Sequence, residues 1–421
     1  MVLHNNPADT PLLPGTPSLL RAINDRTALR LLAEHGPLSR TQIGGLAGLS
    51  KPTASQLMDR LLAVGLVEQV AAEPGVAADP SGPGRVARLY RLRAGAAYVA
   101  GLDVTPARII TRVCDLSGAI LRESVLPTPG RTAVGAVDRV RQALDEATAG
   151  IGLELTSLHH VVIGLGGAVD PQTNRLNFAR HLPGWHDSGL LERLRGGLVP
   201  ASRLVGGARH PVVDLENDVN LAAVAEQTGG AASGCGNFVV LWISDGIGAA
   251  IVIDGKLHRG ASGGAGEVGY MPVPGAPLVR TLNRGANGGF QSIAGAPAVL
   301  KLARAHGFTG ADAPAAVARA VEAGPLGARL LSELADRLAV GLAPIVAVLD
   351  PELIVLTGAI LRAGADPLRE YVAEALHSMA IPRPRLVLSA VPDNPVLAGA
   401  IQAALTATRE TVFSATFPSA A

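Results

Sequence analysis

The sequence predicts a mixed α/β protein, with a winged helix-turn-helix over residues 18–93 and a larger two-lobed body over residues 95–405. Three observations lead to this. The chain has 421 residues, more than one ordinary domain holds. Its first ninety residues contain short capped helices followed by two strands. The remainder shows one strand-rich α/β order twice, which is typical of two related lobes with a cleft between them.

Serines and glycines set the boundaries of the N-terminal elements. Three helices are predicted over 18–36, 39–46 and 50–63, and each begins at a serine that can cap it. Two strands follow over 65–70 and 86–92. Two helices joined by a tight turn, then a strand pair, form the order of a winged helix-turn-helix.

The linking segment 73–84 is rich in Pro and Gly and long enough for a flexible wing. Polar and basic side chains gather beside it and on the exposed face of the third helix, where they can reach phosphates and base edges. The alternative is a small helical subdomain with a solvated polar face. The predicted DNA-binding residues are Arg40, Thr41, Ser50, Lys51, Thr53, Ser55, Gln56, Arg60, Arg85 and Arg88.

Composition excludes several classes of protein. A net charge of +1 excludes a globally basic nucleic-acid binder but allows a local basic face. Two cysteines, Cys114 and Cys235, exclude a disulfide framework and are expected to be buried, reduced thiols. The N-terminus lacks a signal-peptide pattern, and no apolar run is long enough to span a membrane. We therefore expect a soluble, cytoplasmic protein with no membrane partner.

The body repeats its strand order. Each copy opens with a hairpin that has an acidic residue at its turn, Asp103 in the first copy and Asp245 in the second. A helix over 328–348 is expected to pack in the core or between subunits, core being the safer choice. The tail beyond Thr406 is expected to be weakly ordered. The predicted body strands are 98–104, 108–114, 119–125, 160–165, 238–243, 249–253 and 353–357, with helices over 134–149 and from 296 onward.

Three motifs of the body resemble a known family. They are GLGGAVD at Gly164–Asp170, ENDVN at Glu216–Asn220 and GGAGEVGY at Gly263–Tyr270. In this order they resemble the signatures of the ROK family, which groups sugar kinases with sugar-responsive transcriptional repressors. The resemblance runs from the winged helix through Leu397–Ala400. It implies an actin-like (ribonuclease H-like), two-lobed sugar-kinase fold that binds sugar in its cleft.

The resemblance also implies ligand-binding residues. Asp218 occupies the position of the kinase base, where a carboxylate can bind a sugar hydroxyl without chemistry; the alternative is a helix-capping role alone. Tyr270 and His181 could contact a sugar face or simply pack. The residues carried over or considered as sugar ligands are Asn217, Asp218, Glu267, Tyr270, Gln291, His181 and Gly167.

Both phosphate-binding turns depart from the kinase pattern. In the first, Thr105 stands where the kinases have glycine, and Pro106 lacks an N–H. In the second, Asp245 stands where a hydroxyl would contact phosphate. Two unit charges about 4 Å apart repel by roughly 4 kcal/mol at an effective dielectric near 20. We therefore predict that the protein is not an enzyme and does not use ATP.

The zinc ligands of the family are replaced as well. Tyr270, Leu282, Arg284 and Gly289 stand at positions where the family has histidine or cysteine. These side chains offer no thiolate or imidazole for tetrahedral coordination. We predict no metal and no other cofactor.

The sequence therefore predicts a repressor of carbohydrate-utilisation genes. It would bind an inverted-repeat operator in double-stranded DNA as a homodimer, or as a tetramer, and a sugar or sugar derivative would release it. Two alternatives stay open: an active sugar kinase with an added DNA-binding domain, and a regulator that senses no small molecule. The effector, the operator sequence and activation in place of repression cannot be read from the sequence.

Overall fold

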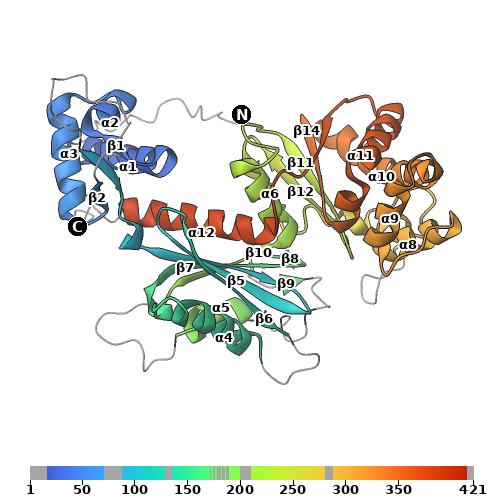
Figure 1. Ribbon diagram of the computed structural model, residues 1–421, viewed down its shortest axis with the longest axis horizontal. Coiled ribbons are helices and arrows are strands. Elements are labelled where there is room, and N and C mark those ends of the chain that lie inside the picture. The colour runs from blue at the N-terminus through green and yellow to red at the C-terminus, as the bar shows by residue number, and fades with distance from the viewer. Residues whose placement is uncertain are drawn as a thin grey trace, which may run out of the picture. The chain divides into compact units, whose positions relative to one another are not determined.

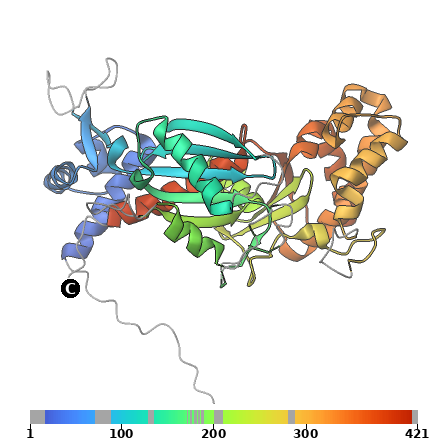
Figure 2. The same cartoon turned by 90° about the horizontal axis from the view of Figure 1, so that it is seen from below.

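The computed structural model describes residues 17–70, 88–128, 135–170, 172–173, 176–177, 182, 185, 189–199, 210–279 and 288–414 (Figures 1 and 2). The chain divides into two compact units. The first unit, called here the DNA-binding unit, runs to Tyr98 and also contains Cys114–Ala119 and the chain from Leu405 onward. The second unit, the body, contains Val99–Val113 and Ile120–Ala404.

The DNA-binding unit has the predicted winged-helix order. Two of the three predicted serine caps are confirmed: Ser39 forms a capping box with Gln42, and the Ser50 hydroxyl accepts from the backbone N–H of Thr53. The predicted cap at Ser18 is wrong, because α1 begins at Pro17 and Ser18 lies inside it. A three-stranded antiparallel sheet in the order β1-β3-β2 completes it. Its elements are α1 (Pro17–His35), β1 (Leu38–Ser39), α2 (Arg40–Leu46), α3 (Lys51–Ala63), β2 (Val67–Val70), β3 (Leu89–Leu92) and η1 (Ala94–Ala96).

The expectation of a weakly ordered tail beyond Thr406 is wrong for residues 407–414, and residues 415–421 lie outside the described ranges. Helix α12 (Pro395–Ser414) continues through this segment. Phe413 is 2% exposed and belongs to the same hydrophobic cluster as Leu29, Leu57 and Tyr90 of the DNA-binding unit. Burial of this aromatic side chain stabilises the last turns of a helix whose own sequence is only weakly amphipathic.

The first half of the body is a five-stranded sheet in the order β10-β7-β4-β5-β6. β7 and β10 are parallel, and their register pairs Asn217 with Leu165, so the second motif begins beside the first. Helix α4 packs on β6, helix α5 packs on β10, and the two helices contact each other (Figure 1). The elements are β4 (Tyr98–Val104), β5 (Arg108–Asp115), β6 (Ile120–Pro127), α4 (Ala136–Ala149), η2 (Leu155–Ser157), β7 (Leu158–Leu165), β8 (Ala168–Val169), β9 (Leu176–Asn177), α5 (Leu190–Gly197), β10 (Val212–Asn217) and α6 (Asp218–Gly229).

The second half repeats this plan, as predicted, with a sheet in the order β13-β12-β11-β14-β15. Helices α8 to α11 pack together beside it (Figure 1). Leu331, Leu334 and Leu338 of α10 are buried in its core, as expected. The elements are β11 (Phe238–Ile243), β12 (Ile247–Ile253), β13 (Lys256–Leu257), η4 (Val268–Tyr270), α7 (Gln291–Ala294), α8 (Ala296–Ala305), α9 (Ala313–Glu322), η5 (Gly324–Leu326), α10 (Ala328–Leu349), β14 (Leu353–Thr357), α11 (Ala359–Met379) and β15 (Arg385–Leu388).

Both cysteines are free thiols, but only Cys114 is buried as expected; Cys235 is partly exposed. Trp185 is 6% exposed. Within the described ranges, no helix combines the length and the apolar character needed to cross a membrane.

Candidate functional site

The surface of α3 opposite its core carries the predicted DNA-binding side chains. Ala54, Leu57, Met58 and Leu61 face the core and are buried. Lys51 and Gln56 are exposed, as are Thr41 on α2 and Arg88 before β3, while Thr53 and Ser55 are half-buried. Ser50 is exposed, but its hydroxyl caps α3 and lies 2.8 Å from the hydroxyl of Thr53.

Two predicted DNA-binding arginines are held by contacts within the unit. Arg40 donates to Ser55 Oγ at 2.6 Å and to Asp59 at 2.5 Å, and its guanidinium lies 5.3 Å from the centre of the Tyr90 ring. Arg60 donates to Asp25, whose side chain is 3% exposed, at 2.6 Å. Arg40 therefore neutralises an acid on the exposed face of α3, and Arg60 ties α3 to α1.

Four residues singled out from the sequence lie outside the described ranges. They are Arg85 beside the wing, His181, and Leu282 and Arg284 from the segment compared with the family's zinc ligands. The predicted wing over 73–84 lies outside the described ranges as well. Their predicted roles stay predictions.

The first phosphate-type turn, between β4 and β5, is closed by its own hydrogen bonds. The Thr105 N–H and hydroxyl both donate to the Arg108 carbonyl, at 2.9 Å each. The Arg108 N–H donates back to the Thr105 hydroxyl at 3.2 Å. Because Pro106 has no N–H, the turn keeps few donors for a phosphate.

The second turn, between β11 and β12, is bridged by Gln291. The Ile247 N–H donates to Gln291 Oε1 at 2.8 Å, and Gln291 Nε2 donates to the Asp245 carbonyl at 3.1 Å. The carboxamide thus binds the loop backbone at both ends. The structure gives the Gln291 amide these contacts with the turn, and its predicted role as a sugar ligand stays a prediction.

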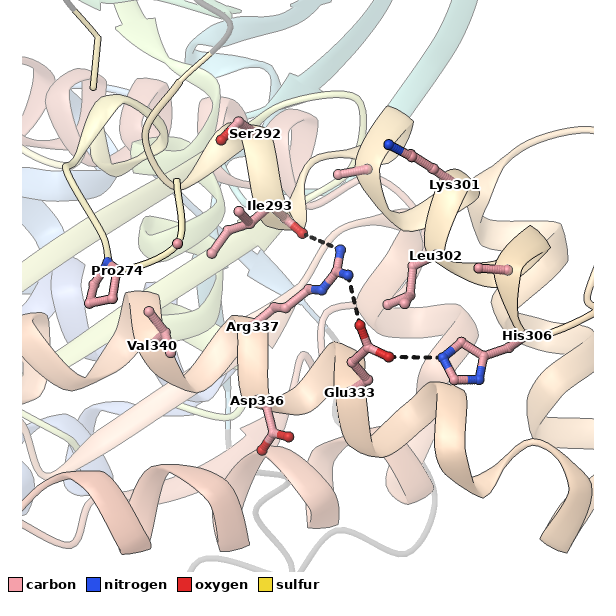
Figure 3. Close-up of a pocket in the computed structure, with 13 residues that line it drawn as sticks. Pro274, Ser292, Ile293, Lys301, Leu302, His306, Glu333, Asp336, Arg337 and Val340 are labelled. Atoms are coloured by element: carbon pink, nitrogen blue, oxygen red, sulfur yellow. Dashed lines mark hydrogen bonds and ion pairs between the residues drawn. The ribbon is translucent and has the colours of Figure 1, made fainter. Parts of the chain in front are cut away.

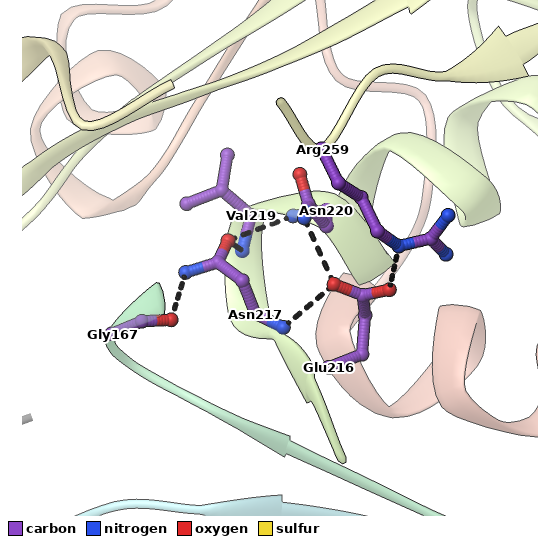
Figure 4. Close-up of polar contacts among 6 residues, drawn as sticks. All are labelled: Gly167, Glu216, Asn217, Val219, Asn220 and Arg259. Carbon is purple, nitrogen blue, oxygen red and sulfur yellow. Dashed lines mark hydrogen bonds and ion pairs between the residues drawn. The ribbon is translucent and has the colours of Figure 1, made fainter. Parts of the chain in front are cut away.

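The N-terminus of α6 is organised by Asn217 (Figure 4). Asn217 Oδ1 accepts from the backbone N–H groups of Val219 and Asn220, and Nδ2 donates to the Gly167 carbonyl at 3.0 Å. An amide nitrogen has two donors, so one is left for a ligand hydroxyl. These bonds join the first motif to the second and place Asp218 at the first turn of α6.

Glu216 forms a contact network that the sequence did not predict (Figure 4). One carboxylate oxygen accepts from Asn220 Nδ2 at 2.9 Å and from the Asn217 N–H at 3.0 Å. The other accepts from Arg259 Nε at 2.7 Å. Because Arg259 comes from the loop after β13, this ion pair connects the two halves of the body. The sequence signal for this network was an acidic residue, Glu216, at the end of an apolar strand. Its partner Arg259 could not be predicted because it is distant in sequence.

Three carboxylates of the body interact electrostatically, Asp103 with Asp218 and Asp218 with Glu267. Burial, and to a lesser degree the charge of Asp103, raise the pKa of Asp218 to about 6. Burial, with the charge of Asp218, raises the pKa of Glu267 to about 7. Burial also raises the pKa of Asp103, although Asn394 and Arg108 oppose this shift. We call Asp103, Asp218 and Glu267 the carboxylate cluster.

Glycines allow the loop that carries Glu267 to approach its neighbours closely. Gly263 has φ +77°, and a Cβ there would lie 2.0 Å from the Val169 carbonyl oxygen. Gly266 has φ +94°, and its Cβ would lie 1.9 Å from the Ala249 oxygen. A side chain at Gly263 would push the loop away from β8, and one at Gly266 would push it away from β12. Tyr270 ends η4 in this loop and is half-buried.

A pocket of about 530 Å³ lies elsewhere in the body, between α7, α8 and α10 (Figure 3). Its polar side is formed by Glu333, which accepts from Arg337 at 2.8 Å and contacts His306 Nε2 at 2.9 Å. Among the described residues, no predicted sugar ligand lines this pocket.

The comparisons with known proteins agree with this architecture. The ROK family model matches residues 99–407. The chain belongs to the ROK family. A MarR family model matches residues 23–75, within the winged helix. This ROK protein therefore has the domain organisation of a DNA-binding transcriptional regulator.

The relatives include both regulators and a kinase. A candidate xylose repressor from Caldicellulosiruptor sp. is 25% identical over 81% of this chain and 84% of its own. The dual regulator NagC of Escherichia coli is 25% identical over 68% of this chain and 65% of its own. A glucokinase of Halalkalibacterium halodurans is 26% identical over 68% of this chain and 87% of its own.

One solved structure extends the comparison to nearly the whole fold. A ROK family transcriptional regulator, a homologue of the E. coli MLC protein, aligns with a TM-score of 0.69 at 18% identity, covering 94% of this chain and 99% of that one. Shared architecture at this identity shows the fold alone, so the activity of this chain has to be argued from its residues.

Proposed function

We propose that this ROK protein is a sugar-responsive repressor that acts in the cytoplasm and has no kinase activity. The winged helix binds operator DNA, and the body binds a sugar or sugar derivative that lowers operator affinity. The observation that carries the proposal is the contrast between a carboxylate cluster and two turns in which the N–H groups of Thr105, Ser244 and Ile247 donate within the protein. Two relatives that are named as a repressor and a transcriptional regulator support the same proposal.

The carboxylate cluster suits a ligand with hydroxyl groups. Carboxylate oxygens accept hydrogen bonds from hydroxyls, and the Asn217 amide adds a donor beside them. Three acidic groups in a partly buried site disfavour a phosphate at the same place. An unphosphorylated sugar is therefore the preferred ligand of this site.

The phosphate turns favour a receptor over an enzyme. Phosphoryl transfer depends on donors aimed at the transferring phosphate. Here the Thr105 N–H binds Arg108, the Ile247 N–H binds Gln291, and Asp245 adds a negative charge. These groups would all have to rearrange to hold ATP.

We further propose that the protein binds an inverted repeat as a homodimer. Two winged helices must meet half-sites about 34 Å apart, or a multiple of this distance, so a small rotation between them abolishes simultaneous contact. A sugar that favours the rotated arrangement then lowers operator affinity.

The test is an ATP-turnover assay with D-glucose, D-xylose and N-acetyl-D-glucosamine. We expect no sugar-dependent ADP release above that of a matched Asp218→Asn variant. Sugar-dependent release by the wild type alone would establish the kinase alternative. In parallel, DNA selected from a random duplex library should contain an inverted repeat, and a single unrepeated half-site would contradict the dimer.

A further inference from the structure

Helix α12 belongs to both compact units. Residues up to Ala404 lie in the body, and residues from Leu405 lie in the DNA-binding unit. At its C-terminal end Phe413 is buried in the core of the DNA-binding unit. The Arg409 guanidinium donates to the carbonyls of Leu116 and Ser117, each at 3.0 Å. This end of the helix is therefore anchored in the unit that carries α3.

The N-terminal end of α12 is anchored at the carboxylate cluster. Asn394 precedes the helix, and its Oδ1 accepts from the Leu397 N–H at 3.0 Å. The Nδ2 of the same amide donates to Asp103 Oδ2 at 2.6 Å. One side chain thus caps the helix and contacts a carboxylate that interacts electrostatically with Asp218.

The first turns of α12 pack against the elements that carry the cluster. A Cβ on Gly399 would lie 1.8 Å from the carbonyl oxygen of Leu221, in the helix that begins at Asp218. A Cβ on Gly101, in the strand of Asp103, would lie 3.1 Å from Ala400 and Ile401. Close-packed elements transmit displacement because no space absorbs it. A shift of α6 or β4 must therefore move α12.

The residue before Asn394 has a backbone conformation that suits a hinge. Asp393 has φ +59°, which is uncommon for a residue other than glycine. Its carbonyl accepts from Arg362 at 3.3 Å. Residues held in sparsely populated conformations occur at switch regions.

We propose that Asn394 is the positioning residue that conveys occupancy of the carboxylate cluster to the DNA-binding unit through α12. A sugar hydroxyl that binds the cluster competes for Asp103 or displaces α6. The Asn394 contact then loosens, and α12 moves as one rod with Phe413 and Arg409 at its far end. This inference rests on the proposed function, because it assigns the path by which the proposed ligand acts.

The test separates the Asp103 contact from the helix cap. Asn394→Ser keeps a good capping oxygen but is too short to reach Asp103. Asp312→Ser is the matched control, since Asp312 caps α9, which packs on α8, α10 and α11. Operator affinity is measured for the full-length proteins with and without D-xylose, D-glucose or N-acetyl-D-glucosamine.

We expect a sugar that weakens operator binding by the wild type to do so equally in Asp312→Ser. In Asn394→Ser the same sugar should bind with an affinity within about threefold of the wild-type value. Its effect on operator affinity, which is about 5- to 150-fold in typical allosteric coupling, should fall toward onefold. An unchanged response in Asn394→Ser would overturn the inference.

A second measurement keeps the inference testable without a sugar. Backbone amides of residues 405–413 should exchange with deuterium at least about tenfold faster in sugar-free Asn394→Ser than in Asp312→Ser, because helix amides open cooperatively once one anchor is lost. Equal exchange in the two variants would overturn the inference. If no sugar affects the wild type while exchange differs as expected, the proposed sugar response fails and the Asn394 linkage stands.

Discussion

Replacing Arg60 with alanine should destabilise the DNA-binding unit through an acid that lies on another helix. Asp25 is 2% exposed, and its carboxylate accepts from Arg60 at 2.6 Å. Removing one partner of a buried ion pair costs about 3–5 kcal/mol, because a charge is left without compensation. Since the Arg60 side chain is 40% exposed, water already screens part of this pair, and we expect a loss of about 2 kcal/mol.

The assay is deuterium exchange of the core amides of α1 and α3 in the full-length protein. A loss of about 2 kcal/mol corresponds to roughly 30-fold faster opening of these amides. The double variant Asp25→Asn, Arg60→Ala has no buried charge to compensate and should recover most of this loss. A double variant that exchanges as fast as Arg60→Ala would refute the reasoning.

The same pair of variants shows how Arg60 affects DNA binding. We expect Arg60 to act by holding α3 on α1, so the double variant should bind operator with the wild-type salt dependence. Each phosphate contact contributes about 0.9 to the slope of log affinity against log salt concentration. A slope lower by this amount in the double variant would instead place the guanidinium on a phosphate.

Three further predictions concern other parts of the protein. Lys51→Ala should lower the salt slope of operator binding by about 0.9, whereas Lys256→Ala in the body should not; equal slopes for the two variants would remove Lys51 from the interface. Glu267→Gln should flatten the pH dependence of sugar affinity measured by calorimetry. Burial raises the pKa of Glu267 to about 7 and that of Asp218 to about 6, so part of each group is protonated below these pH values. Because a sugar hydroxyl donates to the ionised carboxylate, sugar binding must release these protons. Wild-type affinity should therefore rise between pH 5 and pH 8, and a falling profile would contradict hydroxyl donation to carboxylates. Phe413→Ala should destabilise the DNA-binding unit by about 3–5 kcal/mol in exchange measurements, Phe413→Leu should cost less, and a neutral Phe413→Ala would contradict the anchoring of α12.

Local chemistry made much of the fold predictable. Ser39 and Ser50 cap their helices because their hydroxyls satisfy free N–H groups, a requirement readable from neighbouring residues. The apolar run at Leu353–Thr357 is a fully buried parallel strand, as its composition indicates.

Contacts between distant residues were not predictable. The Arg60–Asp25 pair joins residues 35 positions apart, and Asn394 meets Asp103 across 291 positions. The end of α12 shows the same limit, because its turns beyond Thr406 are stabilised by contacts with residues distant in sequence, namely the burial of Phe413 and the bonds from Arg409 to Leu116 and Ser117. The contacts of the Gln291 amide with the turn at Asp245 and Ile247 were likewise not predicted, because they cross 44 and 46 positions of the chain.

The central claim is that sugar binding at Asp218 and Glu267 changes operator affinity without phosphoryl transfer. The most direct measurement is fluorescence anisotropy of a library-selected operator while D-glucose, D-xylose and N-acetyl-D-glucosamine are added in turn, with and without ATP. We predict that at least one sugar weakens operator binding by about 5- to 150-fold without nucleotide, and that Asp218→Asn loses this response. A response that requires ATP, or no response to any sugar, would contradict the claim.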